Sequence, residues 1–356
     1  MKLHRIALGA LAFTGLAVGA AGVSSAAPTP KPKKIPHYSH IFEIMMENTS
    51  YGTIIGNPDA PDINALASTY GLATDYFGVT HPSEPNYVAN LGGDYFAIQD
   101  DNQFYCTPAL ATTDANCAGT TVDHTVSAPS LADQLTAAGL TWKGYFQSLP
   151  PTPAPGAVVT SGPGANGPYT FKYPSNTVAL YASKHNPFVN FTGTQGDLTN
   201  MVPDTQLGTD LAARKVTQVP NYSLIVPDQC HDMHGTSTCT DETGLIQAGD
   251  AYVGTTVSAI MHSKVWTHGR NAIVVTWDED DFSDSGQPGT GCCGSNVGGG
   301  HVPTIVITNK TTTPTADGTA YDHYSLLRSM EDAFGLTHLA HAGDAAVPAM
   351  TPLFRP

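Results

Sequence analysis

The chain has 356 residues, of which 41% are hydrophobic, and 15 lysines and arginines stand against 30 aspartates and glutamates, a formal net charge of −15 at pH 7. Nucleic acids and anionic membranes bind proteins through basic surfaces, so this acidic balance argues against either as a partner. It leaves open a small anionic substrate drawn in by a bound cation. The length suffices for one large α/β domain or two small ones, with an ample core.

The first residues carry the marks of export. A basic start, an apolar run over residues 6–23 and small residues up to residue 27 predict a secretory signal peptide over residues 1–27. The apolar run is about long enough to span a bilayer, so a retained anchor is the alternative. Residues 28–36 are rich in Pro and Lys and predict a flexible tether. Residues 37–356 are expected to form a single secreted domain with no stable membrane anchor, and the sequence leaves its oligomeric state open.

Six cysteines in an exported chain predict disulfide bonds, although six cysteines allow fifteen complete pairings. The pairs that would close short local loops are Cys106–Cys117 and Cys230–Cys239. Cys292 and Cys293 are adjacent in a glycine-rich stretch, where either a strained bridge or two free thiols would fit the sequence. No CxxC pattern occurs, so the cysteines are not predicted to bind zinc.

After the tether, apolar runs alternate with amphipathic segments. The runs that predict buried strands cover residues 41–46, 73–79, 141–147, 221–226, 272–276 and 304–308. The segments that predict helices cover residues 63–70, the stretch that begins at Ser83, and residues 130–138, 207–215, 249–263 and 322–334. This alternation is typical of an α/β fold with a mostly parallel sheet and helices on both faces. Residues 92–126 predict a surface insertion, and residues 149–176 a functional loop or lid.

Acidic and amide side chains follow two of the predicted strands. Glu47 and Asn48 come directly after the first strand. Asp278 and Glu279 open an acidic run close behind the strand of residues 272–276. Ligand groups gather at the carboxyl ends of parallel strands, and crowded carboxylates repel one another unless a cation lies among them. The sequence therefore predicts a metal ion at these strand ends.

Ser83, in the stretch THPSEPNY, stands where a predicted strand gives way to a helix. As an N-cap it would satisfy a free backbone N–H group of the helix. The same helix N-terminus favours an anion such as phosphate beside the serine hydroxyl. Ser83 is therefore either a capping residue or a nucleophile. A second polar cluster, VPDQCHDMHG, holds two histidines and two aspartates at another strand end and predicts a role in a site.

Several longer motifs occur together between residues 41 and 336. They are MMEN, HPSEPNY, SLADQLTAAGLTWKGY, KHNPF, VPDQCHDMHG, TWDEDD, GGGHVP and YDHYSLLRSMEDAFGL. With these motifs the chain resembles the phosphoesterase family of bacterial secreted acid phosphatases and phospholipases C, within the alkaline phosphatase-like superfamily. The resemblance implies a central sheet sandwiched by helices, with a divalent metal ion bound at the strand ends.

The resemblance also implies roles for particular residues. The implied metal ligands are Glu47, Asn48, Asp278 and Glu279, and the groups that act on the phosphate are the nucleophile Ser83 and the histidines His185 and His234. His81, Asp232 and His301 lie in matching motifs without an assigned role. The segment TWDEDDFSDSG departs from the family's acid-glycine-glycine continuation, and two cysteines precede GGGH, which leaves the shape of that side of the pocket open. The sulfatase signature Cys-x-Pro-x-Arg is absent, which argues against sulfate esters.

The expected function is that of a secreted, metal-dependent acid phosphatase that hydrolyses phosphate monoesters through a phosphoserine intermediate. Oxygen ligands alone favour Mg²⁺, Ca²⁺ or Mn²⁺, whereas added histidines would favour Zn²⁺ or iron. One alternative is a phospholipase C or phosphoinositide phosphatase of the same family, with a phospholipid or phosphoinositide in place of a small phosphate ester. Another is a non-catalytic exported protein that binds a cation or phosphate.

Overall fold

The computed structural model describes residues 34–102, 104–149, 180–282, 291–293 and 298–355. The predicted signal peptide, most of the tether and nearly all of the predicted loop at 149–176 lie outside these residues. Residues 34–356 form one compact unit. Among the described residues, no helix combines the length and the apolar character that crossing a bilayer requires.

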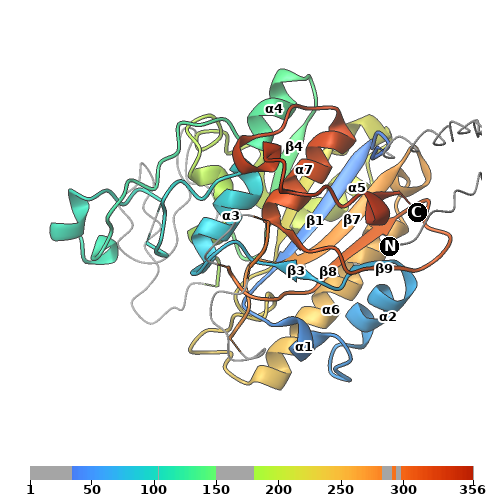
Figure 1. The fold of residues 1–356 in the computed structure, drawn as a ribbon, viewed down its shortest axis with the longest axis horizontal. Helices are drawn as coiled ribbons and strands as arrows, with labels where there is room; N and C mark the ends of the chain where they lie inside the picture. The colour runs from blue at the N-terminus through green and yellow to red at the C-terminus, as the bar shows by residue number, and fades with distance from the viewer. Residues whose placement is uncertain (1–33, 103, 150–179, 283–290, 294–297, 356) are drawn as a thin grey trace, which may run out of the picture. The chain divides into compact units, whose positions relative to one another are not determined.

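An eight-stranded sheet, in the order β5-β4-β6-β1-β7-β8-β2-β9, runs through the described residues (Figure 1). Its strands are β1 His40–Met46, β2 Gly71–Ala73, β4 Trp142–Phe146, β5 Met201–Pro203, β6 Tyr222–Val226, β7 Asn271–Trp277, β8 Thr304–Thr308 and β9 Thr315–Asp317. The five strands from β5 to β7 are parallel, β8 is antiparallel to β7 and β2, and β9 is parallel to β2. The predicted mostly parallel sheet is confirmed. A separate pair joins β3 Tyr76–Phe77 to β10 Tyr321–Asp322.

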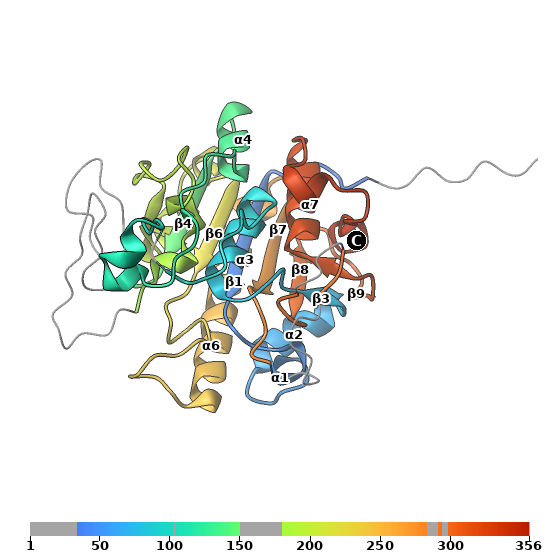
Figure 2. The ribbon, with the colours of Figure 1, turned by 60° about the vertical axis from the view of Figure 1, so that its left-hand side comes forward.

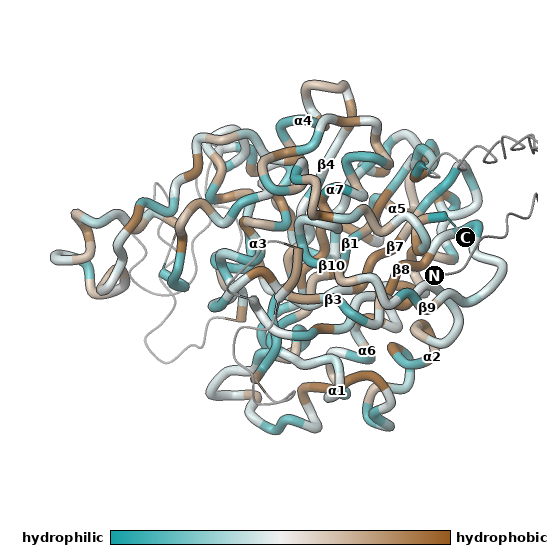
Figure 3. The backbone as a smooth tube through the Cα atoms, in the orientation of Figure 1, coloured by the Kyte–Doolittle hydropathy of each residue, from teal (hydrophilic) through white to brown (hydrophobic). Residues whose placement is uncertain are grey.

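Helices cover both faces of this sheet (Figures 1 and 2). They are α1 Tyr51–Ile54, α2 Pro61–Thr69, α3 Ser83–Gly92, α4 Leu131–Ala137, α5 Thr205–Leu211, α6 Glu242–Met261, α7 His323–Phe334 and α8 Thr351–Phe354. On one face α3 packs against α4 and α7, and on the other α6 packs against α2 and α5. The two layers explain why β1 and β7 are buried along their whole length and are mostly apolar. Figure 3 shows brown, hydrophobic segments at β7 and β8.

The predicted strand over residues 73–79 is wrong, because the chain leaves the sheet after β2 and pairs again only briefly as β3. Beyond β3, the backbone of Gly78 exchanges hydrogen bonds with the glycine loop at Gly299 and Gly300, at 2.8 and 2.9 Å. This contact needs glycine, since a Cβ on Gly78 would lie 2.7 Å from the carbonyl oxygen of Asp278. The approach brings the start of α3 next to the end of β7.

Ser83 is not the N-cap of α3. Pro82 occupies the N-cap position and Ser83 is the first helical residue. The Ser83 hydroxyl contacts the side chains of Glu47, Asn48 and Glu279. The turn before the helix is closed by Asn86 instead, whose Oδ1 accepts the backbone N–H groups of Val79 and Thr80 at 2.9 and 3.1 Å. The Ser83 hydroxyl is therefore available for contacts outside its own helix.

Ser130, by contrast, caps its helix. Its Oγ accepts the backbone N–H of Asp133, and the Asp133 carboxylate accepts the backbone N–H of Ser130 at 2.8 Å, which completes a capping box. We expect Ser130→Ala to lower the free energy of unfolding by about 1 kcal/mol, because one buried N–H loses its partner. Urea unfolding checks this value. An unchanged midpoint would show that the cap contributes nothing.

Glu43 is a fully buried carboxyl in the middle of β1. It accepts hydrogen bonds from Asn90 of α3 at 2.8 Å and from the Tyr222 hydroxyl at 2.7 Å. Burial raises the pKa of Glu43 from 4.5 to about 7, although both hydrogen bonds act in the opposite direction. The folded state therefore holds this proton more tightly than the unfolded chain does. Its contribution to stability is complete below pH 4.5 and is lost as the pH rises through about 7.

Glu43→Gln should remove this pH dependence, because the substituted side chain cannot ionise. From mildly acidic to mildly alkaline buffer, we expect the free energy of unfolding of the wild type to fall by about 3 kcal/mol more than that of the variant. Chemical denaturation of both proteins in the two buffers measures the difference, and other buried carboxyls affect both proteins alike. Parallel pH profiles for the two proteins would show that Glu43 does not bear the shifted proton.

Three disulfides join the six cysteines. The local pairs Cys106–Cys117 and Cys230–Cys239 are confirmed, and the third bridge joins the neighbours Cys292 and Cys293. The sulfur atoms of this last pair and a carboxylate oxygen of Asp322 lie within 4.8 Å of one another. Because the two sulfurs are bonded to each other, they offer no thiolate pair to a metal ion.

Candidate active site

The register of the sheet explains how residues far apart in the sequence meet. Met46 at the end of β1 pairs with Trp277 at the end of β7, so Glu47 and Asp278 follow at neighbouring strand ends. The backbone N–H of Asn48 donates to Asp278 Oδ1 at 3.1 Å, and the Asn48 amide donates to Glu279 Oε1 at the same distance. The four predicted metal ligands therefore lie together.

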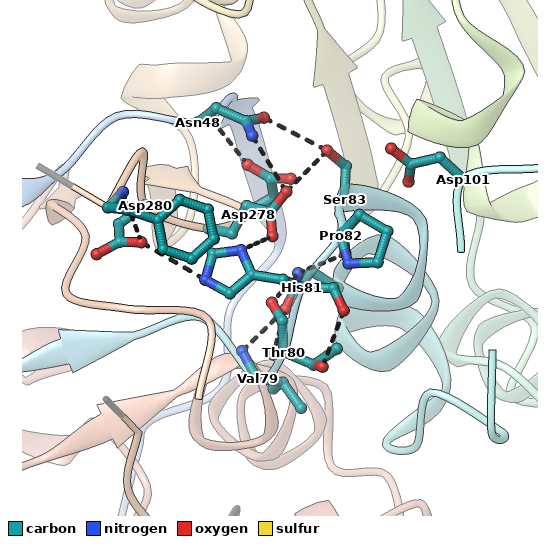
Figure 4. Close-up of polar contacts among 12 residues, drawn as sticks. Asn48, Val79, Thr80, His81, Pro82, Ser83, Asp101, Asp278 and Asp280 are labelled. Carbon is teal, nitrogen blue, oxygen red and sulfur yellow. Dashed lines mark hydrogen bonds and ion pairs between the residues drawn. The ribbon is translucent and has the colours of Figure 1, made fainter. Parts of the chain in front are cut away.

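The hydroxyl of Ser83 points into this group. Its Oγ lies 3.0 Å from Glu47 Oε2, 3.1 Å from Glu279 Oε1 and 3.3 Å from Asn48 Oδ1. Figure 4 shows Ser83 at the start of α3, with Asn48 on one side and Asp101 on the other. A hydroxyl has one proton for these three acceptors, so Ser83 contributes mainly an oxygen to a cluster of oxygens.

These oxygens have the character of a cation site. Asp278 Oδ2 is buried without a hydrogen-bond partner, and Glu47 Oε1 and Glu279 Oε2 make no hydrogen bond but each face a histidine ring. Burial and, after it, the neighbouring carboxylates raise the pKa of Asp278 well above its usual range, and burial raises the pKa of Glu47 to about 8. Buried oxygens that repel one another fit a divalent cation, which the residues Glu47, Asn48, Asp278 and Glu279 could hold.

His81 borders the acidic group on the side of the loop after β7. Its Nδ1 forms an ion pair with Glu279, and its Nε2 lies 3.5 Å from Asp280 Oδ1. The ring of Phe282 stacks on the His81 ring with centroids 4.2 Å apart. His81 therefore orients Glu279 toward Ser83 rather than facing the serine itself.

His185 lies deep in the site. It belongs to a 3₁₀ turn, η3 Ser183–His185, and its ring stacks on Tyr87 of α3 with centroids 5.2 Å apart. Its Nε2 lies 3.1 Å from Glu47 Oε1, and its Nδ1 lies 3.5 Å from Asp232 Oδ2. Burial, and then the nearby positive charge of Lys184, lower the pKa of His185 well below its usual range. The ring therefore links Glu47 to the segment after β6.

His234 lies at the outer edge of the same site. Its ring centroid is 5.9 Å from that of His185, and its Nδ1 contacts the carbonyl oxygen of Gly235 at 2.8 Å. Asp232 holds this loop, since its Oδ1 accepts the backbone N–H of His234 and its carbonyl oxygen accepts the N–H of Glu47, both at 2.8 Å. Partial burial and the charge of Lys184 lower the pKa of His234. The structure thus brings both predicted histidines beside the acidic cluster.

Two other histidines hold the frame of the site. His301 stacks on Tyr51 with ring centroids 4.4 Å apart, and its Nε2 contacts the carbonyl oxygen of Thr74 at 3.1 Å. The buried His323 contacts the backbone carbonyl oxygen of Asp278 through Nε2 at 2.6 Å and the Tyr76 hydroxyl through Nδ1 at 3.0 Å. His323 therefore fixes the backbone that presents Asp278.

Sequence reasoning missed two charged residues of the site, Lys184 and Asp101. Lys184 Nζ lies 3.5 Å from Ser83 Oγ and 2.7 Å from Asp101 Oδ2. Burial acts to lower the pKa of Lys184, but the charges of Asp101 and Glu47 outweigh it and raise the pKa. The sequence signal that could have indicated Lys184 was its position directly before His185 in the motif KHNPF. Asp101 lies in the non-periodic insertion, where no local pattern marked it.

The fold has known counterparts. A protein of the alkaline phosphatase superfamily from Vibrio parahaemolyticus matches this chain with a TM-score of 0.53 and 12% sequence identity, over 84% of this chain and 67% of its own length. The likeness at this identity concerns the fold alone. The fold is therefore an alkaline phosphatase-like α/β fold, and its candidate site has a serine that faces an acidic cluster.

Comparison of the sequence is more specific. The model of the Phosphoesterase family matches residues 57–337. A phosphatidylinositol-3-phosphatase of Mycobacterium tuberculosis is 30% identical over 325 residues, 90% of this chain and 84% of that protein. A probable acid phosphatase of Kluyveromyces lactis is 26% identical over 314 residues, 87% of this chain and 62% of the relative's own length. The chain belongs to the Phosphoesterase family and is a hydrolase of phosphoric esters.

Proposed function

We propose that this protein is a secreted, metal-dependent acid phosphatase that hydrolyses phosphate monoesters through a phosphoserine intermediate. The observation that carries the proposal is the position of Ser83 Oγ, within 3.3 Å of Glu47, Asn48 and Glu279. A capping serine would bond to a backbone N–H of its own helix, whereas the contacts of the Ser83 hydroxyl are with side chains of other segments. The predicted signal peptide and the three disulfides support export.

The acidic cluster supports the metal dependence. A divalent cation held by these side chains would neutralise the phosphoryl oxygens and lower the pKa of the serine hydroxyl. The oxygen donors Glu47, Asn48, Asp278 and Glu279 favour Mg²⁺, Ca²⁺ or Mn²⁺, and Zn²⁺ would need a histidine to join them. A bound cation would give a partner to Asp278 Oδ2, which is buried without a hydrogen-bond partner.

In the proposed reaction, the first displacement begins at Ser83. Ser83 Oγ attacks phosphorus, the bond from phosphorus to the leaving alcohol breaks opposite it, and the serine hydroxyl releases its proton to water. The free N–H groups at the start of α3 favour the equatorial oxygens of the transferred group. Water then displaces Ser83 from phosphorus in the reverse geometry and releases phosphate.

The leaving alcohol needs a proton, and His234 and His185 are the groups we propose for it. His234 is the more open of the two, at the outer edge of the site. Because its surroundings lower the pKa of His234, the imidazolium forms in acidic rather than neutral solution. General acid help of this kind contributes about 10²–10⁴-fold to a rate, so either histidine should matter less than Ser83.

A pair of chromogenic substrates tests the proposal. Para-nitrophenyl phosphate is a monoester, and para-nitrophenyl phosphorylcholine is a diester of the kind that a phospholipase C cleaves. We expect the purified protein to hydrolyse the monoester in mildly acidic buffer and to lose this activity in chelator until a divalent metal is restored. Hydrolysis of the diester alone would overturn the phosphatase assignment, and hydrolysis of neither ester would favour a binding protein.

A phosphoinositide is the second candidate substrate. The observation that favours it is the 30% identity, over 90% of this chain, to a protein named phosphatidylinositol-3-phosphatase. Phosphate release from phosphatidylinositol 3-phosphate should then exceed release from para-nitrophenyl phosphate at equal concentration. A preference for the small ester would leave the general phosphatase proposal in place and remove the phosphoinositide one.

A further inference from the structure

Asp101 lies on the side of Ser83 that faces away from Asn48 (Figure 4), and its carboxylate forms an ion pair with Lys184. The lysine side chain is 14% exposed, and its Nζ lies 3.5 Å from the nucleophilic oxygen. A lysine ammonium is a compact charge that binds phosphoryl oxygens well. Placed here, it is within reach of any phosphoryl group bonded to Ser83 Oγ.

The Asp101 carboxylate accepts hydrogen bonds from two donors at once. Its Oδ2 accepts from Lys184 Nζ at 2.7 Å, and its Oδ1 accepts the backbone N–H of Glu84 at 3.0 Å. That N–H belongs to the first turn of α3, directly after the nucleophile. A helix N-terminal amide beside a lysine is the pair of donors that a phosphoryl group would use. The carboxylate of Asp101 thus lies where two oxygens of a substrate phosphoryl group would be bound.

The segment that carries Asp101 lies outside the sheet and is anchored to α3 through His124. The buried His124 lies between two carboxylates, 3.1 Å from Glu84 Oε1 and 3.2 Å from Asp100 Oδ1. Asp100 and Asp101 belong to the insertion between α3 and α4, which Figure 1 shows beside the sheet rather than within it. Asp101 itself is 31% exposed, so its side chain can turn toward solvent while the segment stays anchored.

We propose that Lys184 is a catalytic residue that, together with the backbone N–H of Glu84, binds the oxygens of the phosphoryl group transferred to Ser83, and that Asp101 occupies this subsite until the substrate displaces it. The inference rests on the proposed phosphatase function. In the first displacement Lys184 donates hydrogen bonds to two phosphoryl oxygens and keeps its proton. The phosphorus–oxygen bond to Ser83 forms as the bond to the leaving alcohol breaks.

The two members of the ion pair should respond in opposite directions. Lys184→Met removes a donor, so we expect kcat/KM for para-nitrophenyl phosphate to fall by about 10²-fold and the inhibition constant of inorganic phosphate to rise by about tenfold. Asp101→Ala removes the competing carboxylate, so the inhibition constant of inorganic phosphate should fall by about threefold or more. Asp101→Asn serves as a second variant that keeps an acceptor for the Glu84 N–H.

Lys143→Met is the matched control, because Lys143 also pairs with an aspartate, Asp210, at 2.6 Å, but does so between β4 and α5. Its kinetic constants should equal those of the wild type. Weaker phosphate binding in both the Lys184 and the Asp101 variants would overturn the inference, since it would make the pair a structural clamp. An unchanged inhibition constant in Lys184→Met would overturn it as well. With either of these results, an active wild type would leave the proposed phosphatase function intact. An inactive wild type would instead overturn both the proposed function and the inference about Lys184 and Asp101.

Discussion

Ser83→Ala is expected to lower kcat/KM for para-nitrophenyl phosphate by more than about 10⁴-fold, because the variant lacks the atom that attacks phosphorus. The free energy of unfolding should change little, since the Ser83 hydroxyl contacts Glu47, Asn48 and Glu279 rather than the backbone of its own helix. Steady-state kinetics and urea unfolding on the same preparation measure the two effects.

Ser130→Ala is the matched control for this experiment. Both substitutions remove a serine hydroxyl at the start of a helix, but Ser130 makes a capping box and lies on α4. We expect the control to lose stability and keep its activity, the reverse of the result at Ser83. Residual activity of the Ser83 variant near that of the wild type would show that another group attacks phosphorus.

Asp278→Asn is expected to abolish metal binding and to lower kcat/KM by about 10³-fold or more. Asp278 is fully buried, one of its oxygens has no hydrogen-bond partner, and Glu47 and Glu279 lie close by. Without a cation these charges repel one another, so removing one of them should stabilise the protein in chelator. With a divalent metal present, the order of stability should reverse, because only the wild type gains from binding. Thermal unfolding in chelator and in metal, together with elemental analysis, measures both effects.

Asp250→Asn controls for the loss of a buried aspartate away from the site. Asp250 lies on α6 and accepts the backbone N–H groups of Asp62 and Ile63 at 3.1 and 2.8 Å. Its variant should bind as much metal as the wild type. Equal metal content in wild type and Asp278→Asn, or the same order of stability in chelator and in metal, would contradict the assignment of Asp278 as a ligand.

The strand ends could be predicted because their signal is local. The runs at β1 and β7 are buried along their whole length and mostly apolar, and the polar residues that follow each run are conspicuous. Parallel neighbours end at the same edge, so Glu47 and Asp278 were expected close together, and the register places them there. The same logic indicated the histidines after β6, because β6 pairs with β1 on its other side.

The start of α3 could not be predicted in the same way. The apolar pattern over residues 73–79 favoured one strand, but the chain leaves the sheet after β2, pairs briefly as β3 and then contacts the loop at Gly299 through Gly78. That loop lies more than two hundred residues away in the chain. Capping propensity favoured Ser83 as the N-cap, whereas Asn86 closes the turn and releases the serine. Contacts with distant segments outweighed local preferences at both places.

Lys184 and Asp101 illustrate a second kind of limit. A lysine and an aspartate are ordinary surface residues, and neither segment has a regular period that would indicate its direction. Their positions follow from packing between the insertion, α3 and the turn η3. The side-chain chemistry of these residues was visible in the sequence, and their proximity to the serine was not.

The stereochemical course at phosphorus is the measurement that decides whether Ser83 forms a bond to the substrate. The substrate is a phosphate monoester made chiral at phosphorus with oxygen isotopes. The metal-loaded protein transfers its phosphoryl group to an added alcohol, and the configuration at phosphorus in the product is compared with that in the substrate. Two successive in-line displacements, the first by Ser83, predict retention of configuration. Inversion would mean a single displacement without a phosphoserine, and it would contradict the proposed mechanism.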